Sequence, residues 1–85
     1  MRKIKVGSIY KHFKGHTYYV IDIVLDCETK DINNPDKIVI YKDIHGSHLT
    51  WARKYSDFAS EVDHEKYPNV KQKYRFEEVD IEWKE

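Results

Sequence analysis

The sequence has few of the residues on which disulfide, metal and phosphate-loop sites depend. Among its 85 residues are one cysteine, Cys27, and three glycines. A single thiol cannot close an intramolecular disulfide, so we expect a reducing location, the cytoplasm. Three glycines leave little room for a phosphate-binding loop, and no Gly-x-Ser-x-Gly segment is present. Phosphate-loop and serine-nucleophile chemistry are therefore not expected.

The chain also lacks an excess of charge and a long apolar run. Lys and Arg total 15, and Asp and Glu also total 15, which gives a formal net charge of zero. No overall field is available to attract nucleic acid or an anionic membrane. The longest apolar run, residues 18–25, contains Asp22 and is too short to span a bilayer, and the first residues do not resemble a signal peptide. We expect no membrane partner and do not favour nucleic acid.

Aromatic residues, by contrast, are plentiful. The chain has seven Tyr, three Phe and two Trp. A domain of this length buries only about 60% of its unfolded surface, so its core is thin and depends on large side chains. Each aromatic side chain buries about 150–250 Å². We expect residues 1–85 to form one domain in which aromatic residues supply much of the core.

The clearest local pattern is a hairpin between residues 9 and 25. It turns near Gly15, a residue that can take a positive φ. In the returning strand β-branched residues dominate and one face is almost wholly apolar, which indicates a strand rather than a helix. Alternation predicts that the opposite face of the hairpin, with Tyr10 and His12, is free for a ligand. The predicted core residues are Ile9, Phe13, Tyr19, Ile21 and Ile23.

The rest of the chain predicts further strands and one helical turn. Residues 56–62 indicate the turn, because Phe58 and Val62 are four residues apart and Ser56 or Asp57 can cap it. Short strands, tight turns and no long helix predict a mainly β fold, a small SH3-like barrel of five or six antiparallel strands. The remaining strands are expected at 37–44, 49–53 and 74–76, with 79–83 either extending the last one or forming a sixth.

The order of residues along these segments resembles one protein family, the small bacterial domain catalogued as domain of unknown function 1653. The resemblance spans about residues 6–77, and its most specific part is the Tyr-x-His-Phe-Lys-Gly hairpin. It implies an SH3-like β-barrel and no established activity. The residues that carry it are Gly7, Tyr10, His12, Phe13, Lys14, Gly15, Tyr18, Val20, Glu28, Thr29, Val39, Tyr41, Gly46, Trp51, Arg53, Phe58, Arg75 and Phe76.

Three features depart from the family pattern. Lys54 stands where the family usually has Pro, and Cys27 stands where it often has Ser. The link over residues 30–36 is longer than the family's. We expect the missing Pro to loosen the exit from the fourth strand and the longer link to alter one rim of the barrel.

The histidines and the cysteine do not have the spacing of a metal or catalytic site. His12 and His16 are four residues apart, but they lie across a hairpin turn and not on one helical face. Cys27 stands between two acidic residues, whose charges disfavour its thiolate. We therefore expect no metal site, no cofactor and no catalytic residue.

A set of seven aromatic and polar residues is the strongest candidate for a ligand site. It combines flat apolar walls with a few directional donors, as SH3-like grooves do. Arg53 in particular can hold a carboxylate or phosphate through two hydrogen bonds. A structural alternative pairs Arg53 with Glu28 and uses Trp51 to fill the barrel. The set consists of Tyr10, His12, Lys14, Glu28, Tyr41, Trp51 and Arg53.

These residues predict a non-catalytic binding module that takes a peptide, a nucleotide or a small anion. One alternative is a nucleic-acid-binding accessory protein, in which the lysines and aromatics of residues 10–14 contact phosphates and bases. Another is a small enzyme, with His12 or Glu28 as acid or base and Arg53 as an anion clamp. A structural role, in which the segment 79–83 pairs with another chain at a sheet edge, is a third.

Overall fold

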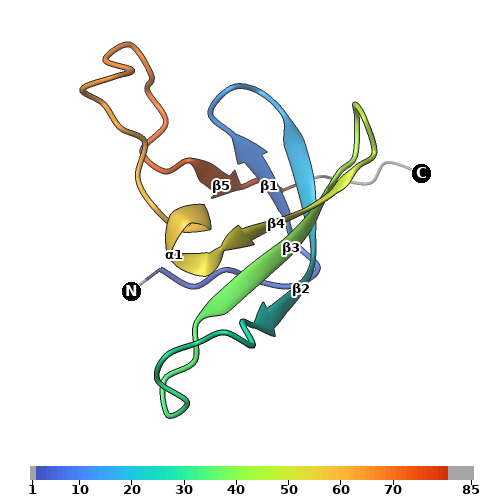
Figure 1. The fold of residues 1–85 in the computed structure, drawn as a ribbon. Helices are drawn as coiled ribbons and strands as arrows, with labels where there is room; N and C mark the ends of the chain where they lie inside the picture. Colours follow the sequence, from blue (N-terminus) through green and yellow to red (C-terminus); the bar gives the residue numbers. More distant parts are fainter. Residues whose placement is uncertain (1, 81–85) are drawn as a thin grey trace.

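The structure, a computed structural model, describes residues 2–80 and consists of one five-stranded antiparallel sheet with a single helical turn (Figure 1). The sheet order is β4-β3-β2-β1-β5, so the first four strands form a meander and the last returns to pair with the first. The mainly β class predicted from the sequence is confirmed. The elements are β1 (Ile9–His12), β2 (Thr17–Leu25), β3 (Lys37–Asp43), β4 (Thr50–Lys54), α1 (Tyr55–Phe58) and β5 (Phe76–Glu78).

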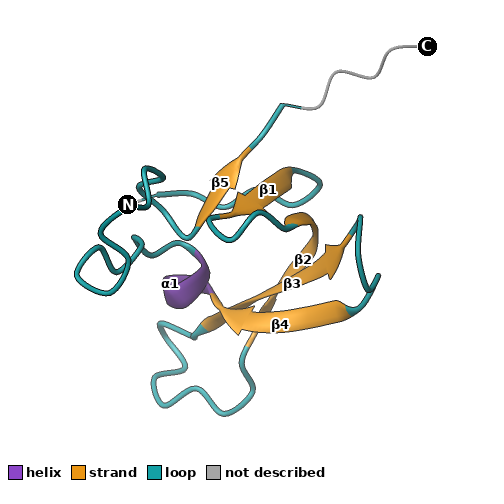
Figure 2. Ribbon diagram, turned by 90° about the horizontal axis from the view of Figure 1, so that it is seen from above, coloured by secondary structure: helices purple, strands orange, loops and turns teal. Residues whose placement is uncertain are grey.

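The sheet is curved, and its two edge strands, β4 and β5, lie on opposite sides of its concave face, with α1 near one end between them (Figure 2). The long strand β2 contains a register shift between Val20 and Asp22, a bulge that bends the strand. Within residues 2–80 no ladder of hydrogen bonds joins β4 to β5. Strand pairing therefore leaves the curved sheet open at this seam.

The predicted core face of the first hairpin is wrong. Tyr10 and Val20 are buried, whereas Tyr19 and Ile21 are about 40% exposed. Because β2 has apolar residues on both faces, alternation alone does not determine which face is inward. The bulge then shifts the alternation by one residue, so that Ile23 packs against the core beyond it. The other two residues predicted to be core, Ile9 and Phe13, are only partly buried.

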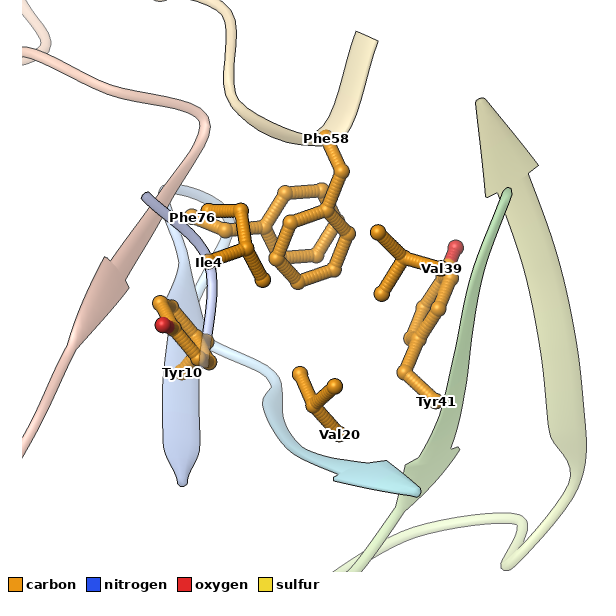
Figure 3. Close-up of a cluster of buried hydrophobic side chains, with 7 residues drawn as sticks. All are labelled: Ile4, Tyr10, Val20, Val39, Tyr41, Phe58 and Phe76. Atoms are coloured by element: carbon orange, nitrogen blue, oxygen red, sulfur yellow. The ribbon is translucent and has the colours of Figure 1, made fainter. Parts of the chain in front are cut away.

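The core lies on the concave face of the sheet and is closed by α1. Phe58 of α1 stacks on Phe76 of β5 with 4.0 Å between ring centroids, and Tyr41 meets both rings edge-on. Burial of one such side chain stabilises the fold by about 1.5–3 kcal/mol. The buried cluster consists of Ile4, Tyr10, Val20, Val39, Tyr41, Phe58 and Phe76 (Figure 3).

The helical turn is shorter than the sequence predicts and has a different beginning. It spans Tyr55–Phe58 and does not reach Val62. Lys54 is the N-cap residue and makes no side-chain capping bond, so the predicted cap by Ser56 or Asp57 is wrong. The carboxylate of Asp57 binds two arginines instead.

A buried carboxylate organises the hairpin between β3 and β4. Asp43 is 6% exposed and accepts hydrogen bonds from the amides of His45, Gly46 and Ser47 at 3.0–3.1 Å. These bonds, that of Gly46 first, lower the pKa of Asp43. A Cβ atom on Gly46 would lie 2.7 Å from Oδ2 of Asp43, so the hairpin depends on glycine at this position.

The predicted last strand is displaced toward the C-terminus. β5 begins at Phe76, two residues later than expected, and the amide of Val79 still donates to the carbonyl of Ile9 at 2.9 Å. Of the segment 79–83, which was predicted to extend this strand or form a sixth, residues 81–83 lie outside the described residues. Residues 63–72 form the expected loop.

Candidate functional site

A recess of about 270 Å³ opens where the β1–β2 turn, β4 and the segment between α1 and β5 meet. We call it the basic pocket. Four of its lining side chains carry positive charge and one carries negative charge. The pocket brings together three of the seven predicted site residues, namely His12, Lys14 and Arg53. Its lining residues are His12, Phe13, Lys14, Arg53, Asp63, Lys66, Tyr67 and Arg75.

Arg53 is held in the pocket from two sides. Its position in β4 is opposite Val39, so its side chain is on the concave face. Its Nε donates to the hydroxyl of Tyr41 at 3.2 Å, and Nη1 donates to Asp57 at 2.9 Å. The guanidinium carbon lies 5.4 Å from the centroid of Phe76. A guanidinium has five N–H donors; within residues 2–80 the other three have no hydrogen-bond partner.

Arg75 reaches the same carboxylate from the segment before β5. Its Nη1 lies 3.6 Å from Oδ1 of Asp57, so one carboxylate serves two guanidinium groups. Its Nε is buried and has no hydrogen-bond partner in the part of the chain that the structure describes. A buried donor without an acceptor costs stability, and because this nitrogen has almost no accessible surface, it is not a donor open to a ligand.

His12 contributes a neutral ring. It packs against Phe13 and Phe76, with ring centroids 4.4 and 4.8 Å away. Its Nδ1 accepts a hydrogen bond from the amide of Lys14 at 3.1 Å, which leaves Nε2 as the nitrogen that carries the proton. Burial, and then the positive charges of Arg53 and Lys14, lower the pKa of His12 to about 4. At neutral pH the ring is therefore an uncharged donor.

The outer wall of the pocket joins the β1–β2 turn to the loop after α1. The rings of Phe13 and Tyr67 lie 5.1 Å apart, and Nζ of Lys14 lies 5.7 Å from the centroid of Tyr67. Nζ of Lys66 is 5.4 Å from the same ring. Neither lysine forms an ion pair with a carboxylate among the described residues. These cations are thus available to a ligand.

Two of the remaining predicted residues are part of the core. Tyr10 is buried, and its hydroxyl accepts a hydrogen bond from the amide of Lys5, so the structure places it away from any ligand-accessible face. Tyr41 is also buried, and its hydroxyl positions Arg53. Sequence alternation had placed Tyr10 on the face predicted to be free for a ligand, which is the face that packs inward.

The other two lie outside the pocket lining. Trp51 is on the concave face of β4, opposite Tyr41, and is 48% exposed, so it does not fill the interior as the structural alternative proposed. Glu28 is exposed in the loop between β2 and β3. The ion pair between Glu28 and Arg53 is not formed, because Asp57 takes the place of Glu28.

Five pocket residues, namely Phe13, Asp63, Lys66, Tyr67 and Arg75, were not among the predicted site residues. Lys66 and Tyr67 come from a loop that the sequence marks only as polar, and Arg75 precedes a strand of three residues. An aromatic residue directly before Pro68, in a mostly polar loop, is the one local signal that could have pointed to this segment.

Metal-ligating groups and membrane spans are absent from the described part of the chain. No group of three or more His, Cys, Asp or Glu side chains comes together among residues 2–80. No helix within the same range is long and apolar enough to cross a membrane. Cys27 is exposed.

The fold and the pocket define a small all-β domain with a cation-lined recess. Residues 8–78 match the model of the family described as "Protein of unknown function (DUF1653)". The match covers most of the chain, which therefore belongs to this family, and the resemblance found in the sequence is confirmed. No curated protein and no solved structure matches the chain.

Proposed function

We propose that this domain is a non-catalytic binding module that takes an anionic group, a carboxylate or a phosphate, in the basic pocket. The observation that supports this is the gathering of cations from three separate segments at one recess of a chain with zero net charge. Four cationic side chains face two carboxylates there, those of Asp63 and Asp57, so positive charge is in excess. Such an excess in a concave site attracts anions.

The donors of the pocket support an oxyanion in particular. Arg53 has N–H groups without partners, and His12 offers Nε2–H. Arginine forks match the paired oxygens of carboxylates and phosphates. A histidine with a pKa of about 4 is a weak base at neutral pH, which favours binding over acid–base catalysis.

Titration of ¹⁵N-labelled protein with sodium phosphate and with acetate tests the proposal. We expect saturable shifts at His12, Lys14, Arg53 and Arg75, and weaker binding as sodium chloride is added. Arg53→Gln should weaken binding by about tenfold, the factor for one charged hydrogen bond. Lys14→Gln should also weaken binding and is the safer variant for folding, because Lys14 forms no ion pair among the described residues.

Lys42→Gln is the matched control. Lys42 is exposed on β3 and lies opposite Thr50, outside the pocket. This variant should bind the anions as the wild type does. Shifts centred elsewhere, or equal binding by Lys14→Gln and Lys42→Gln, would rule out the pocket as the binding site.

A further inference from the structure

Strand β4 has an unpaired side that lies next to the basic pocket. The amide of Asp43 donates to the carbonyl of Leu49 at 3.1 Å, and this bond sets the alternation along the β3–β4 pair. Trp51 and Arg53 consequently bond to β3 through their backbone groups. The amides and carbonyls of Thr50 and Ala52 point to the open side, together with the amide of Lys54.

These edge groups are free of backbone partners throughout residues 2–80, and Thr50, Ala52 and Lys54 are all exposed. β4 lies at the margin of the sheet, as Figure 2 shows. An open edge of this kind is a template onto which an extended segment can add as a further strand.

The side chains of the same strand add specificity. Trp51 and Arg53 are two residues apart and both lie on the concave face, since they pair with the core residues Tyr41 and Val39. Trp51 offers a half-exposed apolar surface, and Arg53 offers guanidinium donors in the basic pocket. β4 carries two positive side chains and no negative one, so a complementary segment is acidic.

We infer that the ligand of the basic pocket is an extended acidic peptide that adds to β4 as an antiparallel strand. This inference rests on the proposed function and names its ligand. A carboxylate across from Arg53 enters the pocket, and an apolar side chain across from Trp51 packs on the indole ring. Antiparallel addition continues the pattern of the whole sheet and is slightly more stable per residue than parallel addition.

The geometry fixes the order of the recognised residues. In an antiparallel partner, the residue opposite Arg53 precedes the residue opposite Trp51 by two positions. The motif, from N to C, is therefore acidic-x-apolar. A parallel partner would require the reverse order.

Blocked octapeptides with Glu-Thr-Leu, Leu-Thr-Glu or Gln-Thr-Leu at their centre test this order in an otherwise identical frame. We expect the first to bind about tenfold more tightly than either of the others, because each of those misplaces or removes one charged hydrogen bond. At saturation, hydrogen exchange of the Thr50 and Ala52 amides should slow by about tenfold or more, because both become bonded.

Lys54→Pro and Lys54→Gln separate the backbone of β4 from its charge. Lys54 has φ −55° and a free amide, so proline fits without strain. Lys54→Pro removes an edge donor and should weaken the Glu-Thr-Leu peptide by about fivefold relative to Lys54→Gln, which keeps that donor. Phosphate binding by the two variants should be equal, since the pocket is intact in both.

The outcomes separate this inference from the proposed function. Phosphate binding in the pocket with equal affinity for all three peptides, or with unprotected β4 amides, overturns the inference alone. Absence of binding by phosphate, acetate and every peptide overturns both. Tighter binding of single-stranded RNA at Trp51 and Arg53 than of any peptide overturns the inference in favour of a nucleic-acid ligand.

Discussion

The ring of His12 lies between two phenylalanines and beside two cations, Arg53 and Lys14. Sequence reasoning selected this residue as a ligand contact because it stands next to Tyr10 and Lys14 in the first hairpin. The structure gives it a second property. Burial and the neighbouring positive charges hold the ring neutral, so its protonation opposes folding.

The stability of the domain should therefore depend on pH through His12. In the unfolded chain the ring takes up a proton near pH 6.5, whereas in the folded chain it does so only near pH 4. The part of the free energy of unfolding that depends on a neutral His12 ring is fully present above about pH 7. It is lost as the pH falls from about 6.5 to about 4. Urea unfolding at pH 7 and pH 4.5 measures it, and His12→Gln should reduce the loss between these two values.

His16→Gln, in the same turn, is the matched control for this measurement. An equal loss of stability on acidification in His12→Gln and in the wild type would contradict the assignment. Hydrogen bonds from the amides of Gly46 and its neighbours lower the pKa of Asp43. Carboxylates of this kind therefore contribute to the loss of stability in a lower pH range than His12 does.

At the scale of elements, the short helix α1 joins the two margins of the sheet. Phe58 is fully buried and stacks on Phe76, which comes from β5 at the far margin from β4. No strand ladder connects β4 to β5 within residues 2–80. The stack therefore links β5 to α1, the helix that directly follows β4.

Phe58→Ala should destabilise the domain by about 3–5 kcal/mol, the range for truncation of a buried phenylalanine. A chain of this length has a total free energy of unfolding of about 4–13 kcal/mol, so we expect partial unfolding at 37 °C. Thermal and urea unfolding followed by circular dichroism measure the change. Ile32→Ala, at a position that is 82% exposed, should alter stability by less than about 0.5 kcal/mol. A loss below 1 kcal/mol in Phe58→Ala would contradict this role.

The positions of the strands could be predicted from the sequence more fully than the face of each strand that packs against the core. Alternation and turn residues act locally, so the strands and the turn at Gly15 lie close to their predicted positions. The inward face of β2 could not be predicted, because both faces are apolar and the bulge after Val20 reverses the alternation. Tyr10 pairs with Tyr18, before the bulge, on the inward face of the hairpin, and it therefore lies in the core.

The site could be predicted only in the part that the hairpins supply. His12, Lys14 and Arg53 stand out by residue type and by their place in the strands, and they meet in the pocket. Lys66 and Arg75 reach it through long-range packing of a loop, which no local pattern reports. The pairing of Arg53 with Asp57, rather than with Glu28, likewise depends on the position of α1 directly after β4.

At the scale of the whole molecule, positive and negative charges are equal in number but unevenly distributed over the surface. The chain has as many acidic as basic residues, yet cations predominate around one recess. Long-range attraction of anions is therefore weak, and the local field of the pocket acts over about one Debye length, roughly 8 Å at physiological salt. Selection of a ligand then depends on close contacts more than on steering.

The carboxylate of Asp57 forms ion pairs with residues on both sides of the open seam of the sheet. It binds Arg53 of β4 at 2.9 Å and approaches Arg75, directly before β5, to 3.6 Å. All three side chains are about one-third to one-half exposed. Ion pairs with that exposure each contribute about 0.2–1 kcal/mol and weaken with salt. The two margins of the molecule are thus joined by charge where a closed barrel would use backbone hydrogen bonds.

Local opening of the edge strands β4 and β5 should consequently depend on ionic strength, whereas opening of the central strands should not. Between low and high sodium chloride we expect amide exchange to accelerate a few-fold in β4 and β5, and to stay constant in the β2–β3 pair. Asp57→Asn should show the faster exchange at both salt concentrations, and uniform acceleration across all strands would contradict the expectation. An anion bound between Arg53 and Arg75 would link the two edge strands reversibly. Amide exchange in β4 and β5 should therefore be slower in the anion-bound domain than in the free one.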